Sequence, residues 1–87
     1  MSYHVEIAPA AQREFKRLPP EVVRKVDAAI LELAQTPRPH GCTKLEGSES
    51  EYRVRVGDYR ILYVIDDKAK RVTIAHVRHR REAYRKR

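Results

Sequence analysis

Arginine is the residue type whose spacing most clearly suggests chemistry in this chain of 87 residues. Arg53 and Arg55 alternate with apolar residues in the segment YRVRV, and Arg60 follows the pair Gly57 and Asp58. A guanidinium group carries a permanent positive charge and a planar fork of donors that fits a phosphate. Arginines gathered on one surface would therefore bind a phosphate and stabilise negative charge developing on it. The alternative is the solvated face of a half-buried strand, which alternates charged and apolar residues in the same way.

The C-terminal segment adds groups that can bind RNA or transfer protons. His79 and Tyr84 flank Arg80 and Arg81, and each can donate or accept a proton. Cleavage of RNA by its own 2′-OH needs orientation, charge neutralisation and proton transfer, and arginine is too basic for proton transfer. The pattern therefore predicts RNA cleavage at an arginine-rich site, with His79 or Tyr84 moving the protons. We expect further basic residues of this segment to bind the RNA: Arg78, Arg81, Arg85 and Arg87.

Positive charge is concentrated at the C-terminal end. Residues 76–87 hold six of the nineteen Lys and Arg residues but one of the twelve acidic residues, and the chain as a whole carries +7. This distribution is typical of a small scaffold that presents one basic surface to phosphate groups. A basic tail that only aids solubility would give the same composition.

The sequence lacks the patterns of several other kinds of site. Its single cysteine, Cys42, excludes an internal disulfide and a cysteine zinc cluster, and the histidines are too scattered to bind zinc. There is no Gly-rich phosphate loop. We therefore expect no metal and no cofactor. Because no signal peptide and no apolar run of about 18 residues is present, we expect a cytoplasmic protein without membrane contact.

The first part of the chain predicts one strand and two helices. Apolar and polar residues alternate over residues 3–7, which predicts a short strand. Pro9 suits the first turn of a helix that runs to about Leu18, where Pro19 and Pro20 interrupt it. From Pro20 onward apolar residues recur at spacings of three and four, which predicts an amphipathic second helix.

The second part predicts a β-sheet. Residues 36–50 are rich in proline and glycine and should form a loop, with a brief strand at residues 44–46. Residues 52–56 alternate strictly, Gly57 begins a tight two-residue turn, and an extended run continues to Ile65. The sequence therefore predicts an antiparallel hairpin followed by further strand.

The register of this hairpin predicts which side chains share a face. Pairing Val56 with Tyr59 across the turn places Arg55 opposite Arg60, with Arg53 on the same face. Like charges directly across two strands are destabilising, so selection for stability alone would not favour the arrangement. We call this face the arginine face and expect the two helices to cover the opposite, apolar face.

A second predicted hairpin extends both faces. It would pair Ile65 with Val72 and Tyr63 with Ile74. With this register His76 falls on the apolar face, where we expect it to be a core histidine. The arginine face would then gain Thr73, Ala75, Val77 and His79.

Taken in order, these segments resemble a known protein family. The strand, the helix, the LPP break, the second helix, and the segments YRVRVGDYRILYVID and VRHRREAYR are similar to the RelE branch of the RelE/ParE superfamily of bacterial toxins, over essentially the whole chain. The resemblance implies a single RelE-like toxin domain over residues 1–87. Its implied fold class is α+β, with a small antiparallel sheet, an N-terminal helical hairpin on one face, and β-α-α-β-β-β order.

The resemblance also implies an activity and partners. RelE-like toxins are metal-independent endoribonucleases that cleave mRNA codons in the ribosomal A site through 2′-OH attack, leaving a 2′,3′-cyclic phosphate. The implied partners are the ribosome with its mRNA and a cognate RelB-like antitoxin that neutralises the toxin. The toxin itself is expected to be a monomer that forms larger assemblies only with its antitoxin.

Roles at the site follow from the resemblance residue by residue. Arg53 and Arg55 fall on the family's basic pair, which acts around the 2′-OH. Arg60 falls on the arginine that stabilises the transition state, and Arg80 on one near the leaving 5′ oxygen. Tyr84 falls on a tyrosine implicated in stacking on the RNA and in proton transfer.

Two questions stay open at this point. His79 occupies a position where some branches have a functional histidine and others a lysine, so it competes with Tyr84 for proton transfer. ParE-type relatives share the fold but inhibit DNA gyrase without a nuclease site, and an inactive relative would only bind its antitoxin. The ribonuclease is favoured by an array that a pure binder would not need: Arg53, Arg55, Arg60, Arg80 and Tyr84.

Overall fold

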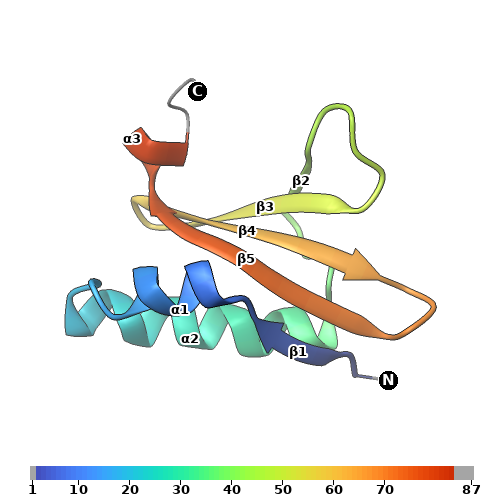
Figure 1. Cartoon of the computed structure of the whole chain (residues 1–87), viewed down its shortest axis with the longest axis horizontal. Helices are drawn as coiled ribbons and strands as arrows, with labels where there is room; N and C mark the ends of the chain where they lie inside the picture. The colour runs from blue at the N-terminus through green and yellow to red at the C-terminus, as the bar shows by residue number, and fades with distance from the viewer. Residues whose placement is uncertain (1, 84–87) are drawn as a thin grey trace.

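A five-stranded sheet carries two helices on one side and a short third helix on the other (Figure 1). The computed structural model describes residues 2–83, the last two of them by their backbone alone. The fold class and the predicted order of elements are confirmed, with an unpredicted helix added after the last strand. The elements are β1 (His4–Ile7), α1 (Pro9–Phe15), α2 (Pro20–Gln35), β2 (Thr43–Lys44), β3 (Glu51–Val56), β4 (Tyr59–Asp66), β5 (Arg71–His79) and α3 (Arg80–Ala83).

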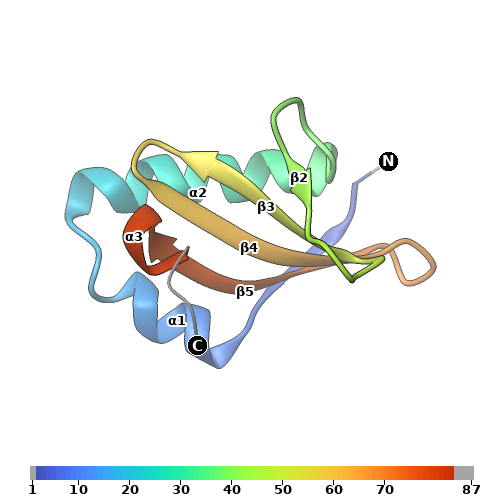
Figure 2. The same cartoon turned by 90° about the horizontal axis from the view of Figure 1, so that it is seen from above.

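The sheet has the strand order β1-β5-β4-β3-β2, and it is mixed rather than wholly antiparallel. Strands β2 to β5 pair antiparallel with their neighbours, whereas β1 pairs in parallel with β5. In the view onto the sheet, α2 runs beneath it and α1 lies beside β5 (Figure 2). The first and last strands are therefore neighbours, and α1 is placed against the edge of β5 that β1 does not reach.

Proline sets the start of both long helical segments. Pro9 and Pro20 stand at the first helical positions, where the missing N–H would have had no partner within the helix. α1 ends at Phe15, earlier than the predicted end near Leu18. The N–H of Leu18 donates to the carbonyl of Phe15 at 3.2 Å, so the chain leaves the helix through a tighter turn before Pro19.

The hydrophobic core fills the space between the two helices and the apolar face of the sheet. α2 contributes Val26, Ile30 and Leu33 to it, at the spacing predicted for its apolar stripe. Within residues 2–83, no helix combines the length and the apolar character needed to cross a bilayer. The buried sheet residues are Tyr52, Ile61, Tyr63, Ile65, Val72, Ile74 and Val77, and α1 adds Ala11.

The predicted register of the first hairpin is confirmed. Val56 pairs with Tyr59, Arg55 with Arg60, and Arg53 with Leu62. Gly57 has φ +60°, a conformation that glycine adopts without steric strain. A glycine at the first turn position is what the tight two-residue hairpin requires, so local sequence is sufficient to fix the pairing.

A β-bulge at Ala75 overturns part of the register predicted for the second hairpin. Tyr63 pairs with Ile74 as predicted, but the next pair along the strands joins Leu62 with His76. Ala75 therefore has no partner on β4. A shift of one residue moves every later side chain of β5 to the face opposite the predicted one.

The bulge changes the faces of three predicted residues. His76 was expected in the core but lies on the arginine face. Val77 and His79 were expected on the arginine face, but Val77 pairs with Ile61 and His79 with Tyr59, so both lie on the helix side. The spacing of three between the buried residues Ile74 and Val77 is the sequence signal for the bulge, because a regular strand separates residues of one face by two.

Candidate functional site

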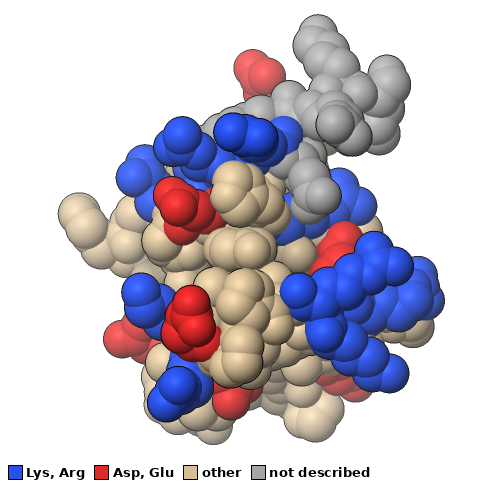
Figure 3. Space-filling model, turned by 90° about the vertical axis from the view of Figure 1, so that its left-hand side faces the viewer, with Lys and Arg blue, Asp and Glu red and all other residues tan. Residues whose placement is uncertain are grey.

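Three arginines stand side by side on the open face of the sheet. Arg55 on β3 pairs with Arg60 on β4, and Arg60 pairs in turn with Arg78 on β5. We call these three residues the arginine row. Arg53 and His76 belong to the same face, two residues along their strands. Basic side chains also gather along the top of the space-filling view, which is the open side of the sheet in Figure 1, and in a second group to the right (Figure 3).

Arg60 occupies the centre of the row and is 7% exposed. Among the described residues it is the one charged residue that is buried. Its Nη1 donates to the carbonyl oxygen of Tyr59 at 3.3 Å. Its two neighbours in the row carry the same charge, and a bound anion would offset the repulsion among the three.

A small cavity of about 150 Å³ lies against the row and is suited to one anionic group. It is smaller than most ligand pockets, which measure about 300 to 1,000 Å³. Gly41 and Thr43 were not predicted as site residues, because they come from the segment between α2 and β3. The lining of this small cavity consists of Gly41, Thr43, Arg53, Arg55 and Arg60.

A polar cluster beside the β4–β5 turn holds the loop that carries Gly41. Arg38 donates to both carboxylate oxygens of Asp67, at 3.3 and 2.8 Å, and to the hydroxyl of Tyr52 at 3.0 Å. The hydroxyl of Tyr3 donates to Asp67 at 2.7 Å. The Arg38 guanidinium first, and then Tyr3, hold the pKa of Asp67 below its usual value. These contacts tie the loop to the sheet at Arg38, three residues before Gly41.

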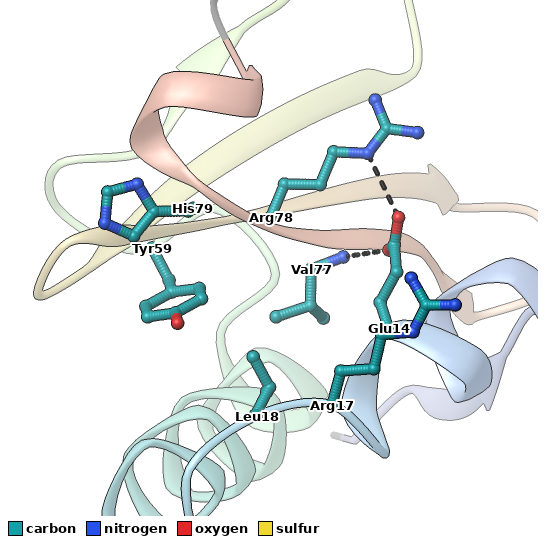
Figure 4. A pocket seen from close by; sticks show the side chains of 7 residues that line it. All are labelled: Glu14, Arg17, Leu18, Tyr59, Val77, Arg78 and His79. Atoms are coloured by element: carbon teal, nitrogen blue, oxygen red, sulfur yellow. Dashed lines mark hydrogen bonds and ion pairs between the residues drawn. The ribbon is translucent and has the colours of Figure 1, made fainter.

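Glu14 on α1 closes the edge of β5 next to the arginine row. β1 pairs with β5 only as far as Ile74, and beyond it the N–H of Val77 donates to Glu14 Oε1 at 2.8 Å. The other carboxylate oxygen, Oε2, accepts a hydrogen bond from Arg78 Nε at 3.1 Å (Figure 4). Oε2 also lies 3.3 Å from His76 Nδ1. Glu14 therefore takes the place of a neighbouring strand and contacts two residues of the arginine face.

Two opposing effects act on the pKa of Glu14. Partial burial raises it, while hydrogen bonds from the N–H of Val77 and from Arg78, and the proximity of His76, lower it. The hydrogen bonds outweigh burial, so the pKa lies below its ordinary value. Stability contributed by such a group is present above its pKa in the unfolded chain and is lost as the pH falls through the folded-state pKa.

We expect Glu14→Gln to lower the free energy of unfolding at pH 7 by about 1 to 3 kcal/mol, the value of hydrogen bonds to a charged group. The difference from the wild-type protein should shrink on acidification below about pH 4.3, the ordinary pKa of a glutamate, because the unfolded chain then binds a proton that the folded carboxylate, with its lower pKa, does not yet bind. Urea unfolding of both proteins at a series of pH values measures this difference in the free energy of unfolding. Asp27→Asn, on the exposed side of α2, is the control for loss of one negative charge. A difference that stays constant down to pH 3 would contradict the expectation.

His79 lies in a second cavity, of about 460 Å³, between α1 and the ends of β4 and β5 (Figure 4). Its ring meets Tyr59 edge to face, with centroids 5.3 Å apart and planes at 80°. Its Nδ1 accepts the backbone N–H of Arg81 at 3.3 Å. The structure thus does not bring His79 to the arginine row. It places the ring on the helix side of the sheet.

α3 begins at Arg80 and lies on the open side of the sheet (Figure 1). The backbone N–H of Arg80 donates to the carbonyl of Asp58 at 2.7 Å, so the start of α3 is fixed to the β3–β4 turn. Both Arg80 and Arg81 are exposed. The remaining predicted site residues lie outside the described range: Tyr84, Arg85 and Arg87.

The part of the chain that the structure describes contains no group of three His, Cys, Asp or Glu residues arranged to hold a metal ion. Cys42 is a free thiol and is half-buried. The side chains of the arginine face offer anion binding by guanidinium groups, and hydrogen bonding by Thr43 and His76.

Known proteins match this chain in sequence and in structure. Residues 5–84 match the family described as "ParE toxin of type II toxin-antitoxin system, parDE". Toxin RelE of Mycobacterium tuberculosis is 41% identical, with 95% of this chain and 87% of that protein aligned. The toxin–antitoxin complex RelBE2 of M. tuberculosis gives a TM-score of 0.81 at 30% identity, covering 91% of this chain and 99% of the other. The archaeal RelE–RelB complex of Pyrococcus horikoshii OT3 gives a TM-score of 0.82 at 30% sequence identity, covering 92% of this chain and 97% of the other. The chain therefore belongs to the RelE branch of the RelE/ParE superfamily, whose members are toxins of type II toxin–antitoxin systems.

Proposed function

We propose that this chain is a cytoplasmic, ribosome-dependent endoribonuclease that cleaves mRNA in the ribosomal A site. The observation that carries the proposal is the arginine row, Arg55, Arg60 and Arg78, on the open face of the sheet with a small cavity against it. Direct cross-strand pairing of like charges lowers stability, so the row needs a reason other than folding. Binding of the negatively charged phosphate backbone of RNA supplies that reason.

The proposed reaction is an internal displacement at phosphorus. The 2′ oxygen forms a bond to the adjacent phosphorus while the bond from phosphorus to the 5′ oxygen breaks. One proton leaves the 2′-OH and another reaches the 5′ oxygen, which gives a 2′,3′-cyclic phosphate and a 5′-OH. Arg60 stabilises the extra negative charge on the phosphorane, Arg53 and Arg55 act around the 2′-OH, and Arg80 lies near the leaving oxygen.

Proton transfer requires a residue other than arginine, because a guanidinium stays protonated at any physiological pH. His79 is held against Tyr59 on the helix side, at 5.3 Å between ring centroids, which makes it the weaker candidate. We assign proton transfer and stacking on the RNA to Tyr84. A site without a strong base gains most from external orientation of the 2′-OH, and the ribosome supplies that orientation.

We expect the purified protein to cleave mRNA on programmed ribosomes and to cut the same RNA poorly when it is free. The physical reason is the dependence of an arginine-based site on prior alignment of the 2′-OH with the phosphorus. Primer extension locates the cut relative to the A site, and end-group analysis identifies the cyclic phosphate.

The same preparation tests the gyrase alternative, which the match to the ParE family description supports. Supercoiled plasmid and DNA gyrase are incubated with the protein, and double-strand breaks are scored after denaturation. Gyrase-dependent breaks together with intact mRNA on ribosomes would replace the ribonuclease proposal with gyrase inhibition.

We also propose that the chain is a monomeric toxin neutralised by a cognate RelB-like antitoxin. The two solved relatives described above are toxin–antitoxin complexes. A basic surface attracts an acidic, disordered segment that folds on binding. We expect the antitoxin to cover the arginine face or to displace residues 81–87, using acidic and apolar side chains. A structure of the complex tests this expectation. The expectation is wrong if the antitoxin neither contacts nor displaces any of these residues: Arg53, Arg55, Arg60 and residues 78–87.

A further inference from the structure

Arg78 differs from the other members of the arginine row because the structure gives it a carboxylate anchor from another element. Its Nε donates to Glu14 Oε2 at 3.1 Å, across 64 residues of sequence. The side chain of Glu14 is 25% exposed and that of Arg78 is 35% exposed, so the contact is partly shielded from water. An ion pair in such a place is stronger than one on the open surface.

The anchor uses only one side of the guanidinium. Figure 4 shows Nε directed at the Glu14 carboxylate and the two terminal nitrogens directed away from it. Within the described residues, those terminal nitrogens have no hydrogen-bond partner. The two terminal nitrogens, Nη1 and Nη2, together form one of the edges through which a guanidinium binds a phosphate in a bidentate manner. Arg78 is therefore held through Nε, and within the described part of the chain its phosphate-binding edge is not occupied.

Two effects besides Glu14 act on the position of the Arg78 guanidinium. Arg78 pairs directly with Arg60, which pairs with Arg55, so repulsion drives the Arg78 guanidinium away from the row. The long, flexible arginine side chain also has rotamer entropy that favours many positions over one. Glu14 lies at the edge of β5 that faces away from β4, so its attraction acts in the same direction as this repulsion and restricts the guanidinium to one position at that edge.

We propose that Glu14 is a positioning residue that holds the Arg78 guanidinium in one place at the outer end of the arginine row, where Arg78 serves as a phosphate-binding arginine for the RNA. This role rests on the ribonuclease function proposed above and adds a residue of α1 to its machinery. Glu14 touches no substrate. It acts through Arg78, and its bond to the N–H of Val77 at 2.8 Å keeps the carboxylate itself in one place.

Glu14→Gln separates positioning from a purely structural role. A glutamine oxygen still accepts the N–H of Val77, so the edge of β5 stays closed. The side-chain amide nitrogen that replaces Oε2 carries only hydrogens and cannot accept from Arg78 Nε. The substitution therefore removes the anchor of Arg78 and retains the contact with the strand.

The test is a double-mutant cycle on programmed ribosomes with Glu14→Gln, Arg78→Ala and the double variant. We expect Glu14→Gln to lower kcat by about tenfold to a hundredfold, the usual effect of a misplaced group, with KM changed by less than about threefold. In the Arg78→Ala background, Glu14→Gln should lower kcat no further. Asp27→Asn, which has the same change of charge on α2, should keep the wild-type kcat.

A second measurement follows the anchor without any cleavage. In protein labelled with ¹⁵N, the Nε–H of Arg78 should exchange with water at least severalfold more slowly in the wild type than in Glu14→Gln. Assays are run at a temperature where circular dichroism shows that every variant is folded.

Each outcome decides the proposal. Equal kcat for Glu14→Gln and wild type, or an equal loss in the presence and absence of Arg78, overturns the positioning role and leaves the ribonuclease proposal intact. Equally fast exchange of the Arg78 Nε–H in both proteins overturns the anchor itself. If the wild-type protein cleaves no mRNA on ribosomes, the ribonuclease proposal fails, and the catalytic meaning of Glu14 fails with it.

Discussion

Arg60→Ala is expected to reduce cleavage of mRNA on programmed ribosomes by about two orders of magnitude or more in kcat, the scale of losing one charge stabiliser in a transition state. Arg60 lies at the centre of the arginine row and lines the small cavity together with Arg53 and Arg55. Its burial keeps water away from the guanidinium, which strengthens its interaction with an anion. Single-turnover kinetics with saturating enzyme isolate this step from binding.

Folding should survive the loss of Arg60. Removing the central charge relieves repulsion from Arg55 and Arg78 and offsets the packing lost with the buried side-chain stem. Thermal unfolding checks this, with the melting temperature expected to hold or to rise. Arg24→Ala, on the exposed surface of α2, is the control for loss of one arginine and should cleave at the wild-type rate. If Arg60→Ala changes only KM, Arg60 docks the RNA and the catalytic assignment is wrong.

Leu33→Ala is expected to lower the free energy of unfolding by about 2 to 5 kcal/mol, the range for removing a buried leucine from a packed core. Leu33 lies on the apolar stripe of α2 and is 1% exposed. A domain of this size has a total stability of about 5 to 10 kcal/mol, so the variant should be partly unfolded at physiological temperature. Chemical denaturation at 25 °C gives the difference directly.

Leu31→Ala provides a matched control in the same helix. Leu31 is 69% exposed, so its truncation removes little buried surface and opens no cavity. We expect a change within about 0.5 kcal/mol. Equal destabilisation by both substitutions would mean that α2 is rotated from the orientation described above.

The sequence by itself determined the features that depend on neighbouring residues. Gly57 at a two-residue turn, flanked by strict alternation, is sufficient to determine the pairing of Arg55 with Arg60. Pro9 and Pro20 likewise determined where the two helices begin. These predictions succeed because turn geometry and the fixed φ of proline are local properties, and because a period of two assigns faces within one hairpin.

The tertiary structure decided the features that depend on residues far apart in the chain. The bulge at Ala75 moved His76 to the arginine face and His79 away from it, since burial of Val77 against the core outweighed regular alternation. The contact of Glu14 with Arg78 exists because β1 pairs with β5 in parallel and then leaves its edge open to α1. No periodicity within either segment encodes that contact. It arises only when packing of the whole domain brings the two elements together.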